Sequence, residues 1–181
     1  MENQERYPLL KPAMTYGLFI AAISILLELL IWILKVEKSF LTSLLGWAVT
    51  FSLLYYSLVN WRNRYMNGYV RYGQAVRTGI LFMFFASIIV AFYTVIYLKW
   101  LDPGAIDQQI GMLEEQFYKQ GYGETEMSAT MDLMIRMKSP GFQFFSGILG
   151  GTIAGVIWSL IAAIFVKKEN DPFQDAMRGV E

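Results

Sequence analysis

The stretch FQFFSGILGGTIAGVIWSLIAAIFV, residues 142–166, is the clearest indication of how this chain folds. It contains no charged side chain and no proline. A helix rises about 1.5 Å per residue and the hydrocarbon core of a bilayer is about 30 Å thick, so a span needs about 20 mostly apolar residues. The stretch therefore predicts a helix that crosses a membrane.

Three further apolar runs precede it. They cover residues 13–34, 40–59 and 79–98, and Glu28 is the one charged side chain within them. Residues 35–38 follow the first run and offer no small-residue cleavage site, so we expect that run to remain as an anchor. The pattern predicts an all-α integral membrane protein, a single membrane domain over residues 1–181 with four transmembrane helices.

The composition agrees with a membrane protein and excludes several kinds of chemistry. Of the 181 residues, 55% are hydrophobic and 17% are charged, whereas soluble domains carry about 25% charged residues. Because the chain has no His and no Cys, a Ser-His-Asp triad, a Cys nucleophile and a His/Cys zinc site are excluded. We expect no enzyme activity, no catalytic residue, no cofactor and no metal. The formal net charge of zero gives no indication of a nucleic-acid partner.

The segment between the third and fourth runs, about 102–139, predicts a helical hairpin outside the bilayer. Asp102-Pro103 is typical of a helix start, with Asp as the N-cap. Two stripes of apolar residues at helical spacing follow: Ile106, Ile110, Leu113 and Phe117, then Met127, Met131, Met134 and Ile135. The stripes pack on each other, on the membrane surface or on a protein partner, and these three alternatives stay open.

The connection between the second and third runs, residues 60–78, mixes aromatic and basic side chains. Its arginines are Arg62, Arg64, Arg71 and Arg77. They are candidate contacts for lipid phosphates, because guanidinium groups pair with phosphate at a membrane surface. Lys and Arg are denser in this connection and in the two tails than on the opposite side. By the positive-inside rule, we expect both termini and this connection in the cytoplasm.

Tryptophans mark the expected ends of the spans. Trp32, Trp61 and Trp100 lie near the C-terminal ends of three runs, and their amphipathic rings favour the headgroup region of a bilayer. Trp47 and Trp158 lie inside runs, so we expect them to pack between helices.

Small residues recur every four positions along the fourth run, at Gly147, Gly151, Gly155 and Ser159. This spacing places them on one face of a helix. Small side chains let another backbone approach closely inside a membrane. The face therefore predicts close helix packing, either with a helix of this chain or with a second copy in a homo-oligomer.

Glu28 is the one ionisable side chain well inside a predicted span. A charge at that depth costs about 2.5–3.5 kcal/mol on insertion scales, so such residues usually have a partner or a function. One interpretation is a proton or cation site, and in this respect the chain resembles small multidrug transporters, which have four helices and a membrane Glu in the first. The other is a structural Glu that is protonated or hydrogen-bonded within the bundle.

Short motifs occur in order along nearly the whole chain. They are Lys11-Pro12-Ala13, Tyr16-Gly17, Trp61-Arg62-Asn63, Gly68-Tyr69, Tyr72-Gly73-Gln74-Ala75, Leu101-Asp102-Pro103, Lys119-Gln120-Gly121, Ser139-Pro140-Gly141, Ser159-Leu160-Ile161 and Lys167-Lys168-Glu169. In order and spacing they resemble the four-span membrane proteins of Bacteroidota known as domain of unknown function 4199. The resemblance implies a cell inner membrane of a Gram-negative organism and the four-helix layout. It implies no activity, ligand or catalytic residue.

Two classes of function remain open. The first is a non-enzymatic interaction or scaffold protein that lies in the lipid bilayer and meets a protein partner through the 102–139 hairpin. The alternative is a small oligomeric transporter, coupled to protons or cations through Glu28.

Overall fold

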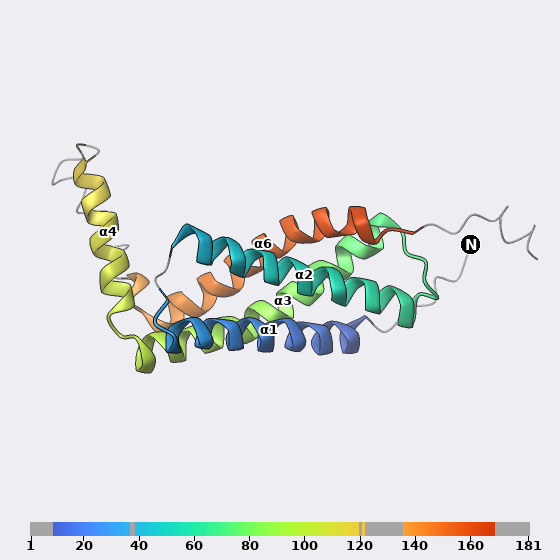
Figure 1. Cartoon of the computed structure of the whole chain (residues 1–181), viewed down its shortest axis with the longest axis horizontal. Coiled ribbons are helices and arrows are strands. Elements are labelled where there is room, and N and C mark those ends of the chain that lie inside the picture. The colour runs from blue at the N-terminus through green and yellow to red at the C-terminus, as the bar shows by residue number, and fades with distance from the viewer. Residues whose placement is uncertain (1–8, 37–38, 120, 122–135, 169–181) are drawn as a thin grey trace, which may run out of the picture. The chain divides into compact units, whose positions relative to one another are not determined.

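The computed structural model of the chain (Figure 1) describes residues 9–36, 39–119, 121 and 136–168. Its four long helices are α1 (Leu10–Ile33), α2 (Phe40–Tyr65), α3 (Tyr72–Ile96) and α6 (Pro140–Val166). A π-helical turn, η1 (Tyr97–Leu101), continues α3, and the shorter α4 (Ala105–Lys119) follows. Each of the four long helices is long and apolar enough to cross a membrane. The prediction of an all-α membrane protein with four spans is confirmed.

The described residues form two compact units. Unit 1 holds those up to Ala86 and those from Gly151 onward, and unit 2 holds those from Ser87 to Gly150. Unit 1 thus contains α1, α2, the first part of α3 and the second part of α6. Unit 2 contains the end of α3, then η1, α4 and the first part of α6.

The helix α2 is longer than the apolar run that predicts it. It begins at a capping box, in which the Ser39 backbone N–H donates to Thr42 Oγ1 over 2.9 Å and the Thr42 backbone N–H donates to Ser39 Oγ over 3.4 Å. It ends at Tyr65, so Arg62 and Arg64 lie in its last turn rather than in a loop. Basic side chains in the last turn of a helix interact favourably with its dipole.

The connection between α2 and α3 is correspondingly short. It turns at Asn67 and Gly68, which have φ of 50° and 84°. These left-handed conformations favour Asn and Gly because neither meets the full steric penalty of other side chains. The last residues of the predicted connection, 72–78, belong to the first turns of α3, which begins at Tyr72.

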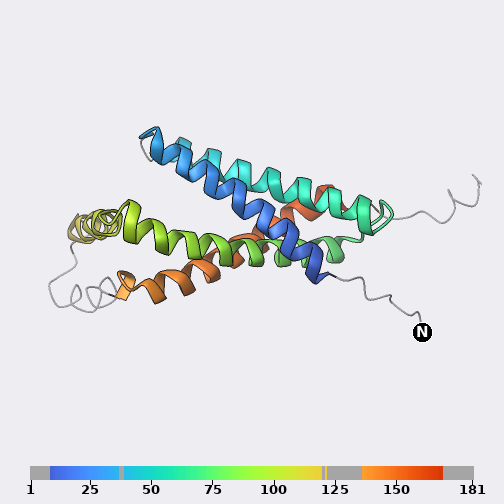
Figure 2. The same ribbon diagram turned by 90° about the horizontal axis from the view of Figure 1, so that it is seen from below.

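In unit 1, α3 packs closely against α1, and α1 lies beside α2 (Figure 2). The Tyr16 ring of α1 stacks on Phe82 of α3, with ring centroids 5.0 Å apart. A Cβ built on Gly17 would lie 2.6 Å from Phe85 Cβ, so glycine is what permits this close approach. The largest fully buried apolar side chains of the unit are Trp61, Phe82, Ile20, Leu54, Leu58 and Val166.

The burial of the tryptophans differs in part from what the sequence predicts. Trp61 is buried in the core of unit 1 rather than exposed to headgroups, because α2 continues past the apolar run and carries it inward. Trp47 is 57% exposed in the part of the chain that the structure describes, so the expected packing between helices is wrong for this residue. Trp158 does pack between helices, with its ring 5.6 Å from that of Phe51.

In unit 2, α4 starts later than the sequence predicts. The Asp102 backbone N–H donates to Tyr97 O over 3.0 Å, and the Tyr97 hydroxyl donates to Asp102 Oδ2 over 3.5 Å. Asp102 therefore closes η1 instead of capping α4, and the helix begins at Ala105. The first apolar stripe lies on the less exposed face of α4: Ile110 is buried, and Ile106, Leu113 and Phe117 are half-buried. The stripe from Met127 to Ile135 lies outside the described residues.

Candidate functional site

The most connected polar region of unit 1 is where α2 ends, α3 begins and α6 ends, and we call it the arginine-rich end. Val70 and Lys168 form an isolated antiparallel bridge, with N–H to O distances of 2.8 and 3.0 Å in the two directions. The Lys168 ammonium also lies over the Tyr69 ring, 5.5 Å from its centroid. These contacts hold the α2–α3 connection against the end of α6.

The four arginines of this region differ in what they contact. Arg62 Nη1 donates to the carbonyl oxygen of Val166 over 2.8 Å, and its Nε donates to Asn63 Oδ1 over 3.1 Å. Arg62 therefore satisfies a carbonyl at the end of α6 that has no partner within its own helix. Arg64 interacts with the Tyr16 hydroxyl of α1. Of the four predicted lipid contacts, Arg62 is thus engaged within the protein, whereas Arg64 is exposed beside Tyr16.

The other two arginines, Arg71 and Arg77, are exposed. Among the described residues, neither guanidinium has a hydrogen-bond or ion-pair partner. Arg71 lies in the connection, just before α3, and Arg77 lies on α3 beside a groove.

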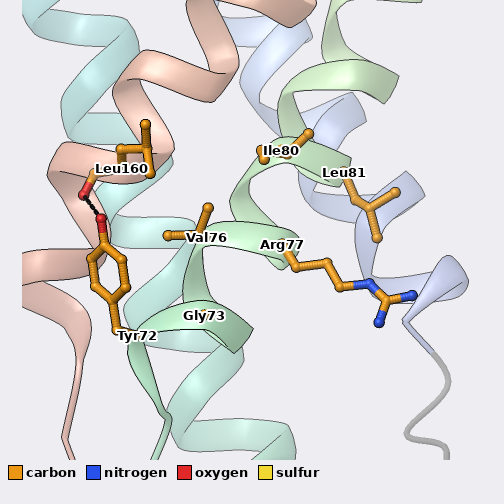
Figure 3. A pocket seen from close by; sticks show the side chains of 7 residues that line it. All are labelled: Tyr72, Gly73, Val76, Arg77, Ile80, Leu81 and Leu160. Atoms are coloured by element: carbon orange, nitrogen blue, oxygen red, sulfur yellow. Dashed lines mark hydrogen bonds between the residues drawn. The ribbon is translucent and has the colours of Figure 1, made fainter.

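This groove runs along the first turns of α3, against Leu160 of α6 (Figure 3). It has a volume of about 370 Å³ and is lined by Tyr72, Gly73, Val76, Arg77, Ile80, Leu81 and Leu160. The Tyr72 hydroxyl donates to the Leu160 carbonyl oxygen over 3.2 Å. Figure 3 shows this pair on one side, Arg77 and Leu81 on the other, and Val76 and Ile80 between them. The result is an apolar trough with one cationic side chain.

The sequence predicts Arg77 as a lipid contact but does not predict the groove. Tyr72 and Leu160 are 88 positions apart, so no local spacing relates them. The one available signal was the register of α3: Tyr72, Val76 and Ile80 recur every four residues and so share a face with one another.

The small residues of α6 lie against α3 of the same chain. In unit 1, Ser159 packs beside Gly79, whose added Cβ would lie 2.6 Å from Ser159 Oγ, and an added Cβ on Gly155 would overlap Met83 Cβ. In unit 2, an added Cβ on Gly147 would lie 3.1 Å from Ala91 Cβ. Gly151 is half-buried. At positions 147, 155 and 159, side-chain volume is limited by α3.

Glu28 lies in α1 and is half-buried. It takes part in an interaction within the chain. In the described part of the chain, no group of three or more acidic side chains is placed to hold a metal ion.

Unit 2 has a second hollow, at the base of α4, which we call the α4 pocket. It has a volume of about 310 Å³, and its lining combines apolar side chains with charged ones: Val95, Leu98, Lys99, Pro103, Ile106, Asp107, Lys138, Pro140 and Gln143. Lys138 Nζ pairs with Asp107 Oδ1 at 2.7 Å, and both side chains are exposed. Gln143 Nε2 donates to Met137 O over 3.1 Å. Lys99 Nζ lies 5.9 Å from the centroid of the Trp100 ring and has no carboxylate partner among the described residues.

Comparison with known proteins identifies a family and no closer relative. The family model described as "Protein of unknown function (DUF4199)" matches residues 15–168. No curated protein and no solved structure matches the chain.

Proposed function

We propose that this chain, which belongs to the family described as "Protein of unknown function (DUF4199)", is a non-enzymatic interaction protein. Its four apolar helices make it a multi-pass membrane protein. The proposal places the contact with a protein partner on α4 and the α4 pocket. We further propose an inner-membrane location, with both termini and the α2–α3 connection in the cytoplasm, because Lys and Arg are concentrated there.

The α4 pocket is the observation that carries this proposal. Its apolar walls offer a place for an apolar side chain of the partner, and Lys99 offers a cation for a carboxylate beside it. Hollows that combine apolar walls with a few polar groups are typical of recognition sites. The exposed face of α4 adds to this surface, because Met112 and Tyr118 are 63% and 66% exposed on a helix that is too polar to span a membrane.

The test is cross-linking in native membranes with a photoreactive amino acid in place of Met112. We expect one protein to be captured reproducibly at that position. The matched control carries the same amino acid at Leu26, an exposed position on α1, where we expect lipid adducts only. In a Lys99→Glu background, the yield at position 112 should fall roughly five-fold, the equivalent of about 1 kcal/mol for an exposed ion pair. Equal adducts at both positions, unaffected by Lys99→Glu, would contradict the proposal.

A transporter is the second candidate, and Glu28 is the observation that favours it. An acidic side chain that is half-buried within a span is costly and is often functional. If this candidate holds, the cross-linked product is a defined homo-oligomer of this chain, and proton flux in proteoliposomes depends on Glu28. The Glu28→Gln variant should then lose pH-linked flux while keeping its oligomeric state. Flux equal to that of the wild-type protein would remove this candidate.

A further inference from the structure

We propose that the groove between α3 and Leu160 binds one anionic phospholipid, with an acyl chain in the apolar trough and the phosphate on Arg77. The proposal concerns the arginine-rich end of unit 1 and does not depend on the α4 pocket or on a protein partner.

The lining of the groove fits an acyl chain. Val76, Ile80 and Leu81 of α3 and Leu160 of α6 form an apolar trough that is open on one side. The trough lies on helices that qualify as membrane spans, so we expect its open side to face the lipid phase. A flexible hydrocarbon chain can follow an irregular apolar surface and so gain many van der Waals contacts with it.

The position of Arg77 fits a headgroup phosphate. Arg77 is the sixth residue of α3, which places it about 8 Å along the helix from Tyr72. A side chain at that depth extends readily to the headgroup region. Guanidinium binds phosphate through paired hydrogen bonds, so Arg77 is suited to a phosphate ester.

The charge around the groove favours an anionic lipid over a zwitterionic one. At the arginine-rich end, the described residues include Arg71, Lys167 and Lys168 near the groove helices, all of them exposed. Basic residues near a membrane surface attract anionic lipids by about 1 kcal/mol each.

The groove is also held in shape before any lipid binds. The hydrogen bond from Tyr72 to Leu160 O and the paired hydrogen bonds between Val70 and Lys168 tie the start of α3 to the end of α6. A preformed site loses less conformational entropy on binding than a flexible one. Arg62 contributes indirectly, since it binds Val166 O and so fixes the end of α6.

The experiment is native mass spectrometry of the purified full chain in detergent, with phosphatidylglycerol and phosphatidylcholine of identical acyl chains as probes. We expect the wild-type protein to retain one phosphatidylglycerol, about ten-fold more strongly than phosphatidylcholine. Arg77→Gln should remove that preference. The matched control is Arg71→Gln, which removes an exposed arginine outside the groove lining. It should lower the preference clearly less than Arg77→Gln does, because it removes only the long-range attraction between charges.

A second pair of variants tests the trough without altering charge. An added Cβ on Gly73 meets nothing within 4 Å, so Gly73→Phe is expected to fold while its ring occupies the groove. It should lower retention of phosphatidylglycerol about ten-fold with Arg77 still present. Gly46→Phe, on α2 and equally open, serves as the control and should retain the lipid.

Three results would overturn the proposal. The first is equal retention of the two lipids by the wild-type protein. The second is an equal effect of Arg77→Gln and Arg71→Gln, which would indicate general charge attraction. The third is displacement of phosphatidylglycerol by inorganic phosphate to the same extent in the wild-type protein and in Gly73→Phe. That result would indicate a phosphate site without an acyl-chain trough.

Discussion

At the scale of single residues, unit 1 contains two buried hydroxyl groups that lack a hydrogen bond. Ser57 Oγ and Ser159 Oγ are fully buried, and neither has a partner among the described residues. Other hydroxyls on these helices bond to the carbonyl four residues earlier, as Ser52 does to Ala48 O over 2.8 Å. Leaving a buried polar group unsatisfied costs about 1–3 kcal/mol. The space beside Gly79 explains why a small residue stands at 159, but nothing in the structure explains why it is Ser rather than Ala.

This predicts that Ser159→Ala stabilises the protein by about 1 kcal/mol, because it removes the unsatisfied hydroxyl and keeps the Cβ that packs beside Gly79. The measurement is the midpoint of thermal unfolding in detergent. Ser52→Ala is the control, since Ser52 is exposed and hydrogen-bonded, and its stability should change by less than about 0.5 kcal/mol. A lower midpoint for Ser159→Ala would mean that its hydroxyl has a hydrogen-bond partner in the membrane.

At the scale of helices, α3 is the element on which the packing of unit 1 depends. Both α1 and α6 approach it through small residues, at Gly17 and at Gly155. Inside a membrane, helices associate through close van der Waals contact rather than through the hydrophobic effect, so such contacts carry much of the stability. The four-residue repeat on α6 indicated close packing, and the alternatives were this chain or a second copy. The structure places α3 of the same chain against Gly155.

Gly17→Ala should therefore destabilise unit 1, although alanine is the better helix former. An added Cβ would lie 2.6 Å from Phe85 Cβ, and it would also lie 3.0 Å from Phe82 O and 3.1 Å from the Ala86 backbone nitrogen. Backbone atoms cannot move aside cheaply, and overpacking costs about 1–3 kcal/mol.

The control for this prediction is Gly46→Ala. An added Cβ there meets nothing within 4 Å, so the gain in helix propensity of up to about 1 kcal/mol should appear. Thermal unfolding should move in opposite directions for the two variants. The same shift for both would show that α1 and α3 are not in close contact at Gly17.

At the scale of the whole molecule, the proposed orientation is the prediction to test. A reporter that is active only in the cytoplasm, fused after Glu181, should be active, and the same reporter inserted after Gly121 should be inactive. The physical reason is the concentration of Lys and Arg in the tails and the α2–α3 connection. Activity at Gly121 together with inactivity at Glu181 would reverse the assignment.

The helical class of the chain and its four membrane-spanning segments follow from the amino-acid sequence. Length, absence of charge and helical periodicity are local properties, and a bilayer leaves backbone hydrogen bonds few solutions other than a helix. The sequence did not predict how far α2 and α3 extend beyond their apolar runs. In α2, Trp61 continues the buried face of the helix, but its polar neighbours are typical of a loop.

What each arginine contacts depends on the tertiary structure. Arg62 and Val166 are 104 positions apart, and Tyr72 and Leu160 are 88 apart. Four arginines close together in sequence look equivalent, yet Arg62 binds the end of α6, Arg64 is exposed beside Tyr16, and Arg77 borders an apolar groove. The distinction depends on which helix lies beside each one. Local sequence shows which residues are small enough for close packing, but it does not encode which helix packs against them.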